Sequence, residues 1–373
     1  MIIGLLKEIK PNEYRVAATP AAIGQIVARG HKVLVQAGAG IGSGFADEEY
    51  AAAGATILQT AEEVYTQADL FYKVKEMFPQ EWKYMNRDKI VYTYIHSNAH
   101  PEETDAILES KVTAIAYEDI TDDNGQFPLL KPMSILAGKG GFLAALHHSQ
   151  SVFGGNGTLL ANVTGIPTPV VTIIGCGNSG MGAAELAAGF GNTVRILDVN
   201  LKAMEAAKSQ LPANVSFLMS NRENLLTCLR DSDVIINCIL WPKHRKDHLI
   251  NREDLKLMKK SAMIIDVACD DEGAVETCRS TTHDDPVYYE EGILHYCVDN
   301  IPSAFARTAS IMLCNATLPF LLKIADMGVE QALKADKHLR KGLTAYNGLL
   351  TLAETAKKQN RVLTDADELV KGF

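Results

Sequence analysis

The feature that most constrains the fold is a glycine-rich turn between a short apolar run and a helical run. Residues 170–174 read Val-Val-Thr-Ile-Ile, which is typical of a β-strand covered on both faces. Gly175, Gly177 and Gly180 follow in a GxGxxG pattern, and residues 181–188 have a helical composition. In such a turn the first glycine allows a tight bend, the second lets a diphosphate approach the backbone, and the third lets the helix pack on the strand. The pattern therefore predicts a strand–turn–helix unit that binds a dinucleotide.

An acidic residue at the end of the next predicted strand indicates which dinucleotide is bound. Residues 193–198 form that strand and end in Asp198, about 20 residues after the glycine turn. A carboxylate at this place accepts hydrogen bonds from the ribose 2′-hydroxyl and repels a 2′-phosphate. We therefore expect NAD rather than NADP, although Lys202 in the next helix weakens this discrimination. A structural glycine turn followed by a solvated aspartate is the alternative interpretation.

Predicted strands and helices alternate on both sides of this turn. β-type runs lie before it, among them 2–6, 32–35 and 90–94, and after it up to 263–266. This alternation predicts an α/β fold with two doubly wound, mostly parallel sheets in Rossmann-like domains joined by long helices. We expect a discontinuous catalytic domain formed by residues 1–130 and 305–373, and an NAD-binding domain formed by residues 131–304. From about residue 300 onward the pattern predicts helices throughout, and Gly138, Gly140 and Gly141 in a predicted helix at 133–150 indicate close approach of another backbone or a ligand.

Charge and hydropathy exclude several classes of protein. The 45 acidic and 36 basic residues give a formal charge of −9, which argues against a nucleic-acid-binding surface. The most apolar stretch, 311–324, is interrupted by polar residues and is interpreted as too short and too polar to span a membrane. The cysteines form no CxxC pair, and the adjacent His147 and His148 point to different helix faces, so no metal site is expected. The composition indicates a cytoplasmic enzyme with no nucleic-acid or membrane partner.

Segments spread over residues 7–302 carry a second and more specific pattern. They include Lys-Glu-Ile-Lys-Pro-Asn-Glu-Tyr-Arg-Val-Ala-Ala-Thr-Pro at 7–20, Lys-Val-Lys-Glu at 73–76 and Tyr-Ile-His at 94–96. Further segments are Ile-Ala-Tyr-Glu at 115–118, Pro-Leu-Leu-Lys-Pro-Met-Ser at 128–134, Asp-Val-Ala-Cys-Asp at 266–270 and Asn-Ile-Pro at 300–302. In this order they resemble the alanine dehydrogenase and pyridine nucleotide transhydrogenase family.

The resemblance implies a role for individual residues. The family's substrate-binding arginine and lysine fall on Arg15 and Lys75, its acid/base histidine on His96, and the aspartate that faces this histidine on Asp270. A guanidinium group matches a carboxylate, and an imidazole exchanges protons near neutral pH, so these residue types fit the implied chemistry. Taken singly, each of these charged residues can also be an ordinary surface or paired charge, the histidine can be structural, and Ser134 can be a helix cap. The remaining implied contacts are Met133 and Asn300 for the substrate, and Ser134, Ser220 and Leu240 for the cofactor.

The reaction implied by the resemblance is the reversible NAD-dependent oxidative deamination of a small L-amino acid, with L-alanine first, to its 2-oxo acid and ammonia. A homohexamer is implied as well. An opine-type dehydrogenase of the saccharopine or carboxyethylornithine kind, which condenses a 2-oxo acid with a basic amino acid, is a competing hypothesis. Asp271 and Glu272, at a place where the family has glutamine and glycine, favour it, and Lys139 replaces the family's arginine. A soluble transhydrogenase subunit and a non-catalytic NAD sensor are also compatible with the sequence.

Overall fold

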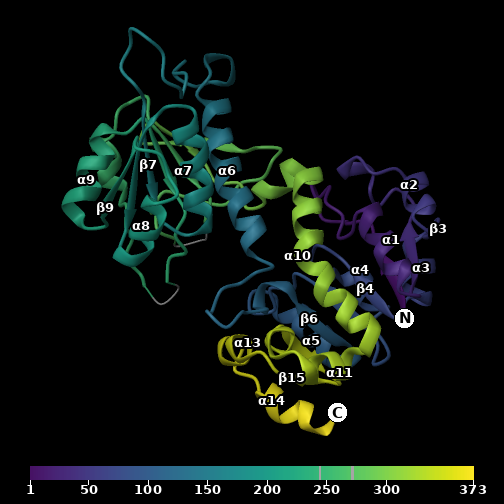
Figure 1. Cartoon of the computed structure of the whole chain (residues 1–373). Coiled ribbons are helices and arrows are strands. Elements are labelled where there is room, and N and C mark those ends of the chain that lie inside the picture. The colour runs from purple at the N-terminus through teal and green to yellow at the C-terminus, as the bar shows by residue number, and fades with distance from the viewer. Residues whose placement is uncertain (243–244, 270–272) are drawn as a thin grey trace. The chain divides into compact units, whose positions relative to one another are not determined.

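The computed structural model describes residues 1–242, 245–269 and 273–373, which divide into two compact units. Unit 1 comprises Met1–Met133 and Phe305–Phe373, and unit 2 comprises Ser134–Ala304. Each unit contains one mostly parallel sheet with interleaved helices (Figure 1). The predicted α/β class with two doubly wound sheets is therefore confirmed.

Unit 1 is built on an eight-stranded sheet in the order β15-β14-β6-β5-β4-β1-β2-β3. The strands from β6 to β3 pair in parallel, and β14 and β15 continue the sheet in antiparallel pairing. The strands are β1 (Ile2–Leu5), β2 (Lys32–Gln36), β3 (Thr56–Leu58), β4 (Leu70–Tyr72), β5 (Ile90–Thr93), β6 (Thr113–Ala116), β14 (Leu343–Tyr346) and β15 (Leu349–Leu350). The helices are α1 (Pro20–Ala28), α2 (Asp47–Ala52), α3 (Ala61–Gln67), α4 (Pro79–Trp82), α5 (Pro101–Ser110), α10 (Ala306–Met327), α11 (Val329–Ala335), α12 (Lys337–Lys341), α13 (Ala353–Lys358) and α14 (Ala366–Leu369).

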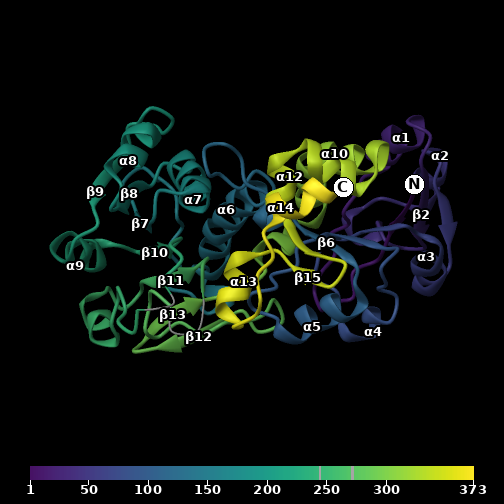
Figure 2. The same cartoon turned by 90° about the horizontal axis from the view of Figure 1, so that it is seen from below.

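Successive residues of the central strands of unit 1 point to opposite layers of helices. On one face, the Tyr72 hydroxyl is hydrogen-bonded to the Thr317 hydroxyl in α10, and the Tyr92 hydroxyl donates to the Thr317 carbonyl oxygen at 3.1 Å. On the other face, Phe71 and Val91 join the apolar core that includes residues of α3 and α5. Figure 2 shows α10 along one face of this sheet and α3, α4 and α5 along the other. Because both faces are covered, the strands read as continuous apolar runs.

The prediction of a helical chain from about residue 300 onward is wrong for residues 343–350. These residues form β14 and β15, and β14 pairs with β6 so that Leu343 lies beside Ile115. Strands of four and two residues are too short to display a two-residue period, which explains why the pattern does not reveal them.

The apolar stretch predicted at 311–324 belongs to a longer helical segment, Ile301–Met327. By length and composition this segment is apolar enough to cross a membrane, so its interpretation as too short is wrong. Of its most apolar window, 56% is buried inside the protein, and Leu313 and Leu321 are fully buried in unit 1. Such burial is typical of the core helix of a globular domain.

Unit 2 is built on a seven-stranded sheet in the order β12-β13-β11-β10-β7-β8-β9, in which only β12 is antiparallel to its neighbour. The sequence pattern predicts five strands for this unit, the last at 263–266, and does not predict β12 and β13. Figure 1 shows α7, α8 and α9 around β7 and β9. The strands are β7 (Val170–Ile174), β8 (Thr193–Asp198), β9 (Val215–Met219), β10 (Val234–Asn237), β11 (Met263–Asp266), β12 (Val287–Glu290) and β13 (Ile293–Tyr296). The helices are α6 (Lys131–His148), which begins in unit 1, α7 (Asn178–Gly189), α8 (Leu201–Lys208) and α9 (Arg222–Asp231).

Glycines in α6 allow it to pack directly on its neighbours in unit 2. A Cβ atom on Gly138 would lie 1.8 Å from the carbonyl oxygen of Ser179, in the first turn of α7. A Cβ atom on Gly141 would lie 2.7 Å from the Val267 side chain, just after β11. The predicted close approach at these two glycines is confirmed, and the neighbour in both cases is the protein itself.

Candidate active site

The glycine turn after β7 has two glycines that the protein needs for its own packing and one that it does not. Gly175 has a φ of +102°, and a Cβ on it would lie 2.6 Å from Ile239. A Cβ on Gly180 would lie 1.9 Å from the Gly175 carbonyl oxygen. Gly177 has a φ of −82° and precedes α7, and a Cβ on it would meet no atom within 4 Å. The open space at Gly177, at the positive end of a helix, fits a diphosphate that must approach the backbone closely.

Asp198, at the end of β8, lies beside this turn. Its Oδ2 atom accepts a hydrogen bond from the Cys176 backbone N–H at 2.6 Å, and its Oδ1 atom accepts one from the Asn200 N–H at 2.7 Å. An ionised carboxylate has further acceptor positions beyond these two bonds, so Asp198 can also bind a ribose hydroxyl. Ser220 lies next to it, because the Ser220 N–H donates to the Asp198 carbonyl oxygen at 2.9 Å. The exposed Leu240 follows β10 and comes directly after Ile239, the residue that meets Gly175.

The other residues of unit 2 that were predicted to belong to the site are Ser134, Asn300 and Asp270. Because α6 begins at Lys131, Ser134 lies inside its first turn, and the interpretation of Ser134 as the helix cap is wrong. Asn300 is buried, and its backbone carbonyl oxygen accepts hydrogen bonds from His283 Nε2 and the Ser303 hydroxyl, both at 2.9 Å. Asp270, together with Asp271 and Glu272, lies outside the described residues, so its predicted role stays a prediction.

Arg15 is buried and Lys75 is half-buried in unit 1, and the charge of each reaches the other. Arg15 is 3% exposed, its Nε atom donates to Glu13 at 2.6 Å, and its Nη1 atom lies 3.3 Å from Met133 Sδ. Burial disfavours the charge of Arg15, but the hydrogen bond and charge of Glu13 outweigh it and raise the arginine's pKa. Burial and the nearby charge of Arg15 lower the pKa of Lys75. A guanidinium and an ammonium group whose charges influence each other are of the types that suit a carboxylate.

His96 follows the carboxyl end of β5 in unit 1, and its imidazole is 43% exposed. Its backbone φ is +52°, in the left-handed region. The N–H groups of Ile95 and His96 both donate to the Glu118 carboxylate, and His96 Nδ1 lies 3.5 Å from Glu118 Oε1. The Thr93 hydroxyl donates to the Lys75 carbonyl oxygen at 2.8 Å and so links the segments that carry Lys75 and His96. Lys75 and His96 thus follow neighbouring parallel strands at the carboxyl edge of this sheet, the edge where open α/β sheets bind ligands.

Sequence reasoning assigned no role to Glu13 and Glu118, which hold Arg15 and His96 in place. Glu118 could have been found from topology, since it follows β6 as His96 follows the adjacent β5, and residues after neighbouring parallel strands meet at one edge. Glu13 lies two residues before Arg15, a spacing that by itself indicates no pairing.

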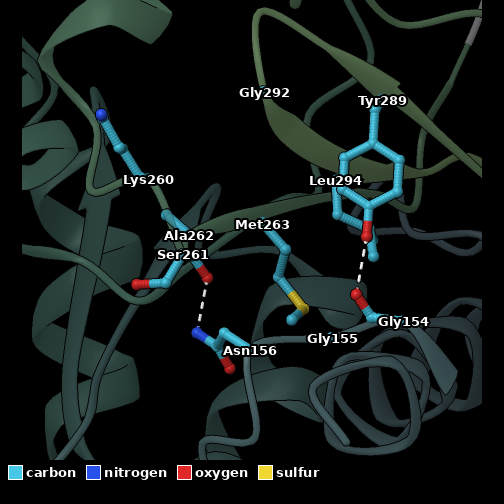
Figure 3. Close-up of a pocket in the computed structure, with 10 residues that line it drawn as sticks. All are labelled: Gly154, Gly155, Asn156, Lys260, Ser261, Ala262, Met263, Tyr289, Gly292 and Leu294. Carbon is cyan, nitrogen blue, oxygen red and sulfur yellow. Dashed lines mark hydrogen bonds between the residues drawn. The ribbon is translucent and has the colours of Figure 1, made fainter. Parts of the chain in front are cut away.

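A separate pocket of about 210 Å³ in unit 2 lies at the other edge of its sheet. It is lined by residues before and at the start of β11 and β13, including Lys260, Met263 and Leu294, and by Gly154–Asn156. Figure 3 shows the Tyr289 hydroxyl directed at the Gly154 carbonyl oxygen, and the Asn156 amide directed at that of Ser261, at 2.8 and 2.7 Å. No predicted site residue lines this pocket. Across the three described ranges, no three His, Cys, Asp or Glu side chains form a metal-binding group.

Two family models together match most of the chain, and the second extends from unit 2 into the second segment of unit 1. Residues 4–137 match the family model "Alanine dehydrogenase/PNT, N-terminal domain", and residues 142–353 match "Alanine dehydrogenase/PNT, C-terminal domain". The chain is 41% identical to an alanine dehydrogenase of Methanococcus maripaludis over 99% of both chains, and 40% identical to that of Bacillus subtilis over 96% of this chain and 94% of the relative. A solved L-alanine dehydrogenase superposes with a TM-score of 0.92 at 36% identity, covering 96% of this chain and 99% of the other. A transhydrogenase from Sinorhizobium meliloti shares the fold, with a TM-score of 0.79 at 23% identity over 94% of this chain and all of the other.

Proposed function

Since the chain belongs to the alanine dehydrogenase/pyridine nucleotide transhydrogenase family, we propose that it interconverts L-alanine with pyruvate and ammonia, using NAD as the hydride carrier. The observation that carries this proposal is the identity of about 40% to alanine dehydrogenases over nearly the full length. The opine-type hypothesis is not favoured, because the relatives matched over the whole chain are alanine dehydrogenases. The transhydrogenase likeness supports the fold alone.

The residues of unit 1 supply substrate binding and proton transfer. Arg15 and Lys75 hold the carboxylate of the amino acid, and the guanidinium provides directional hydrogen bonds. NAD, when bound, accepts a hydride from the substrate Cα, which leaves an iminium group on the substrate. His96 removes a proton from the water that attacks this iminium, and it transfers a proton again when ammonia leaves the resulting carbinolamine. In the reverse direction His96 performs the same transfers in the opposite order.

The residues of unit 2 fit NAD. Space at Gly177 accommodates the diphosphate, and Asp198 accepts hydrogen bonds from the adenosine ribose. We propose that Ser220 and Leu240 line the nucleotide site after β9 and β10, and that Ser134 contacts the nicotinamide ribose. We assign Asp270 to stabilising the iminium charge, and Met133 and Asn300 to substrate contact.

The test is the loss of NADH absorbance with pyruvate plus ammonium, followed by the same assay with ammonium replaced by lysine or ornithine. Turnover with ammonium and none with the diamines is expected. Turnover only with a diamine would instead establish an opine-type enzyme, with Asp271 and Glu272 as candidate amine anchors. Cofactor binding without turnover in either assay would indicate a non-catalytic NAD sensor.

We also infer, from the family resemblance and the composition, a cytoplasmic homohexamer. Light scattering on the protein as it leaves a size-exclusion column should give a mass six times the 40.5 kDa of one chain. A mass of one or two chains would contradict the hexamer without affecting the assignment of the reaction.

A further inference from the structure

The carboxylate of Glu118 is placed to act on His96 through both the backbone and the ring. Glu118 lies in a short turn, Tyr117–Asp119, that follows β6, and Thr93 of β5 is paired with Ala116 of β6. The register therefore places Glu118 beside the segment that leads from β5 to His96. The side chain of Glu118 is only 11% exposed, so its charge is shielded from bulk water.

The backbone of His96 is held in an unusual conformation by this carboxylate. A φ of +52° is uncommon for a residue other than glycine and requires support from its surroundings. Glu118 Oε1 accepts hydrogen bonds from the N–H groups of Ile95, at 3.1 Å, and His96, and Oε2 lies 3.3 Å from the Ile95 nitrogen. Charge-assisted bonds to two successive N–H groups supply that support.

The ring of His96 is fixed by the same carboxylate and by a tyrosine. Nδ1 is the ring nitrogen paired with Glu118, at 3.5 Å from Oε1, a distance at which the carboxylate charge acts on the ring. The imidazole is parallel to the ring of Tyr94, with centroids 5.9 Å apart and 2° between the planes. The Tyr94 hydroxyl donates a hydrogen bond to the Leu129 carbonyl oxygen at 2.8 Å, which holds the tyrosine ring in place.

Several other titratable groups surround Glu118 and His96. Burial, and then the charge of Glu118, raise the pKa of Asp119 to about 8. Burial raises the pKa of Glu103 to about 9. The charge of the exposed Glu354 also acts on Asp119. Burial lowers the pKa of His100 against the opposing charge of Glu76, and the charges of His96, Lys10 and Lys75 add to the lowering. Among these acidic groups, Glu118 is the one whose carboxylate contacts both the backbone and the ring of His96.

We propose that Glu118 is the positioning residue of His96, fixing its backbone and ring and keeping the proton of the neutral imidazole on Nδ1, so that Nε2 accepts the proton in the reaction. The inference rests on the proposed function for its catalytic consequence. The tautomer and ring placement are properties of unit 1 alone. The relationship resembles the carboxylate–imidazole pair of other acid/base enzymes, in which the carboxylate orients the ring and does not itself take part in proton transfer to substrate.

The decisive variant is Glu118→Gln, which retains the size and one carbonyl acceptor but removes the charge. We expect kcat/KM for pyruvate to fall roughly 10- to 100-fold, which is less than the loss expected on removing the base itself. The KM for pyruvate should change little, because Arg15 and Lys75 remain. The acidic limb of the pH profile should move to lower pH, because the imidazolium loses a neighbouring anion. Glu354→Gln, the same substitution in the same charged neighbourhood but without a contact to His96, should leave the profile unchanged.

A measurement independent of turnover separates this inference from the proposed reaction. In protein labelled with ¹⁵N-histidine, the His96 ring nitrogens should report the Nδ1–H tautomer in the wild type and a mixed or Nε2–H population in Glu118→Gln. An unchanged tautomer and titration midpoint would overturn the positioning role, whether or not the protein turns over pyruvate. If Glu118→Gln does not fold, Glu118→Asp, which keeps the charge on a shorter arm, should retain the tautomer while lowering kcat. Loss of the Nδ1–H tautomer in that variant would also count against the proposal.

Discussion

The carbonyl oxygen of Gly175 lies 1.9 Å from the place where a Cβ atom would stand on Gly180, so these two glycines hold the turn after β7 and the start of α7 in direct contact. Gly177, between them, has no such neighbour. The protein therefore requires two of the three glycines for its own packing, whereas the third leaves room for a ligand.

Gly177→Ala should fold normally and bind cofactor poorly. The added methyl group meets no protein atom within 4 Å but occupies the space offered to the diphosphate, so we expect the Kd for NADH to rise about 10-fold or more. The melting temperature without cofactor should change by no more than about 2 °C. Gly189→Ala, at the other end of the same helix and also in open space, is the matched control and should alter neither quantity. Equal NADH affinity in Gly177→Ala and wild type would show that the diphosphate does not bind at this turn.

Asp198→Asn should reduce the preference for NADH over NADPH. The substitution keeps an acceptor for the Cys176 N–H but removes the negative charge that binds ribose and repels a 2′-phosphate. The ratio of kcat/KM for the two reduced cofactors should fall about 10- to 100-fold, as expected for the loss of a charged hydrogen bond. Asp231→Asn removes a carboxylate of the same unit that is paired with Arg195 at 2.9 Å, and should leave the ratio unaltered. An unchanged ratio in Asp198→Asn would place the ribose elsewhere.

His96→Ala should lose at least about two orders of magnitude in kcat, because no acid/base group remains to exchange protons with the attacking water. Binding of NADH, measured by its fluorescence, should persist, since the cofactor residues belong to unit 2. His31→Ala, a histidine of the same unit that is paired with Asp326 at 2.9 Å just before β2, provides the control and should turn over normally. Undiminished turnover without His96 would exclude it from the mechanism.

Glu103→Gln should change how stability depends on pH. Burial raises the pKa of Glu103 to about 9, so the folded protein keeps a proton that the unfolded chain releases above about pH 4.5. The unfolding free energy of the wild type therefore declines through this window relative to the variant. The advantage of the variant should grow between pH 5 and 8 by on the order of 1–3 kcal/mol.

The control is Glu102→Gln, which removes an exposed carboxylate one residue earlier in α5. The unfolding free energy of the two variants and the wild type, measured in urea at pH 5 and pH 8, separates the effect of the buried carboxyl from that of an exposed one. Equal pH dependence in all three proteins would show that Glu103 is ionised in the fold.

Local patterns could be predicted from the sequence, and distant pairings could not. The strand, turn and helix around Gly177 follow each other along the chain, so composition and glycine spacing suffice to predict them. The pairing of Leu343 with Ile115 joins segments far apart in the sequence, and the short β14 has no period of its own. The short β12 and β13 escape prediction for a similar reason, since no helix separates them to mark an alternation.

The substrate residues could be predicted from their chemistry and from the family resemblance, but the residues that support them could not. Arg15, Lys75 and His96 stand out because their residue types suit a carboxylate and a proton transfer. The contribution of Glu118 depends on a left-handed φ at His96 and on the direction of a carboxylate, and neither leaves a trace in residue composition. The pairing of Glu13 with Arg15 likewise becomes evident only from side-chain geometry.

The insertion of unit 2 between the two segments of unit 1 also sets an order of events during synthesis. When residues 1–133 have left the ribosome, β6 still lacks its neighbour β14, and Tyr72 and Tyr92 still lack the helix that covers them. Unit 2 is complete as soon as residue 304 emerges, so it can fold first, whereas the earlier-made sheet must wait with an open edge and an uncovered apolar face. In a nascent chain stalled once residue 304 has emerged, unit 2 should therefore resist a protease and unit 1 should be cleaved. At this stage the chain exposes the most apolar surface and strand edge for a chaperone to cover.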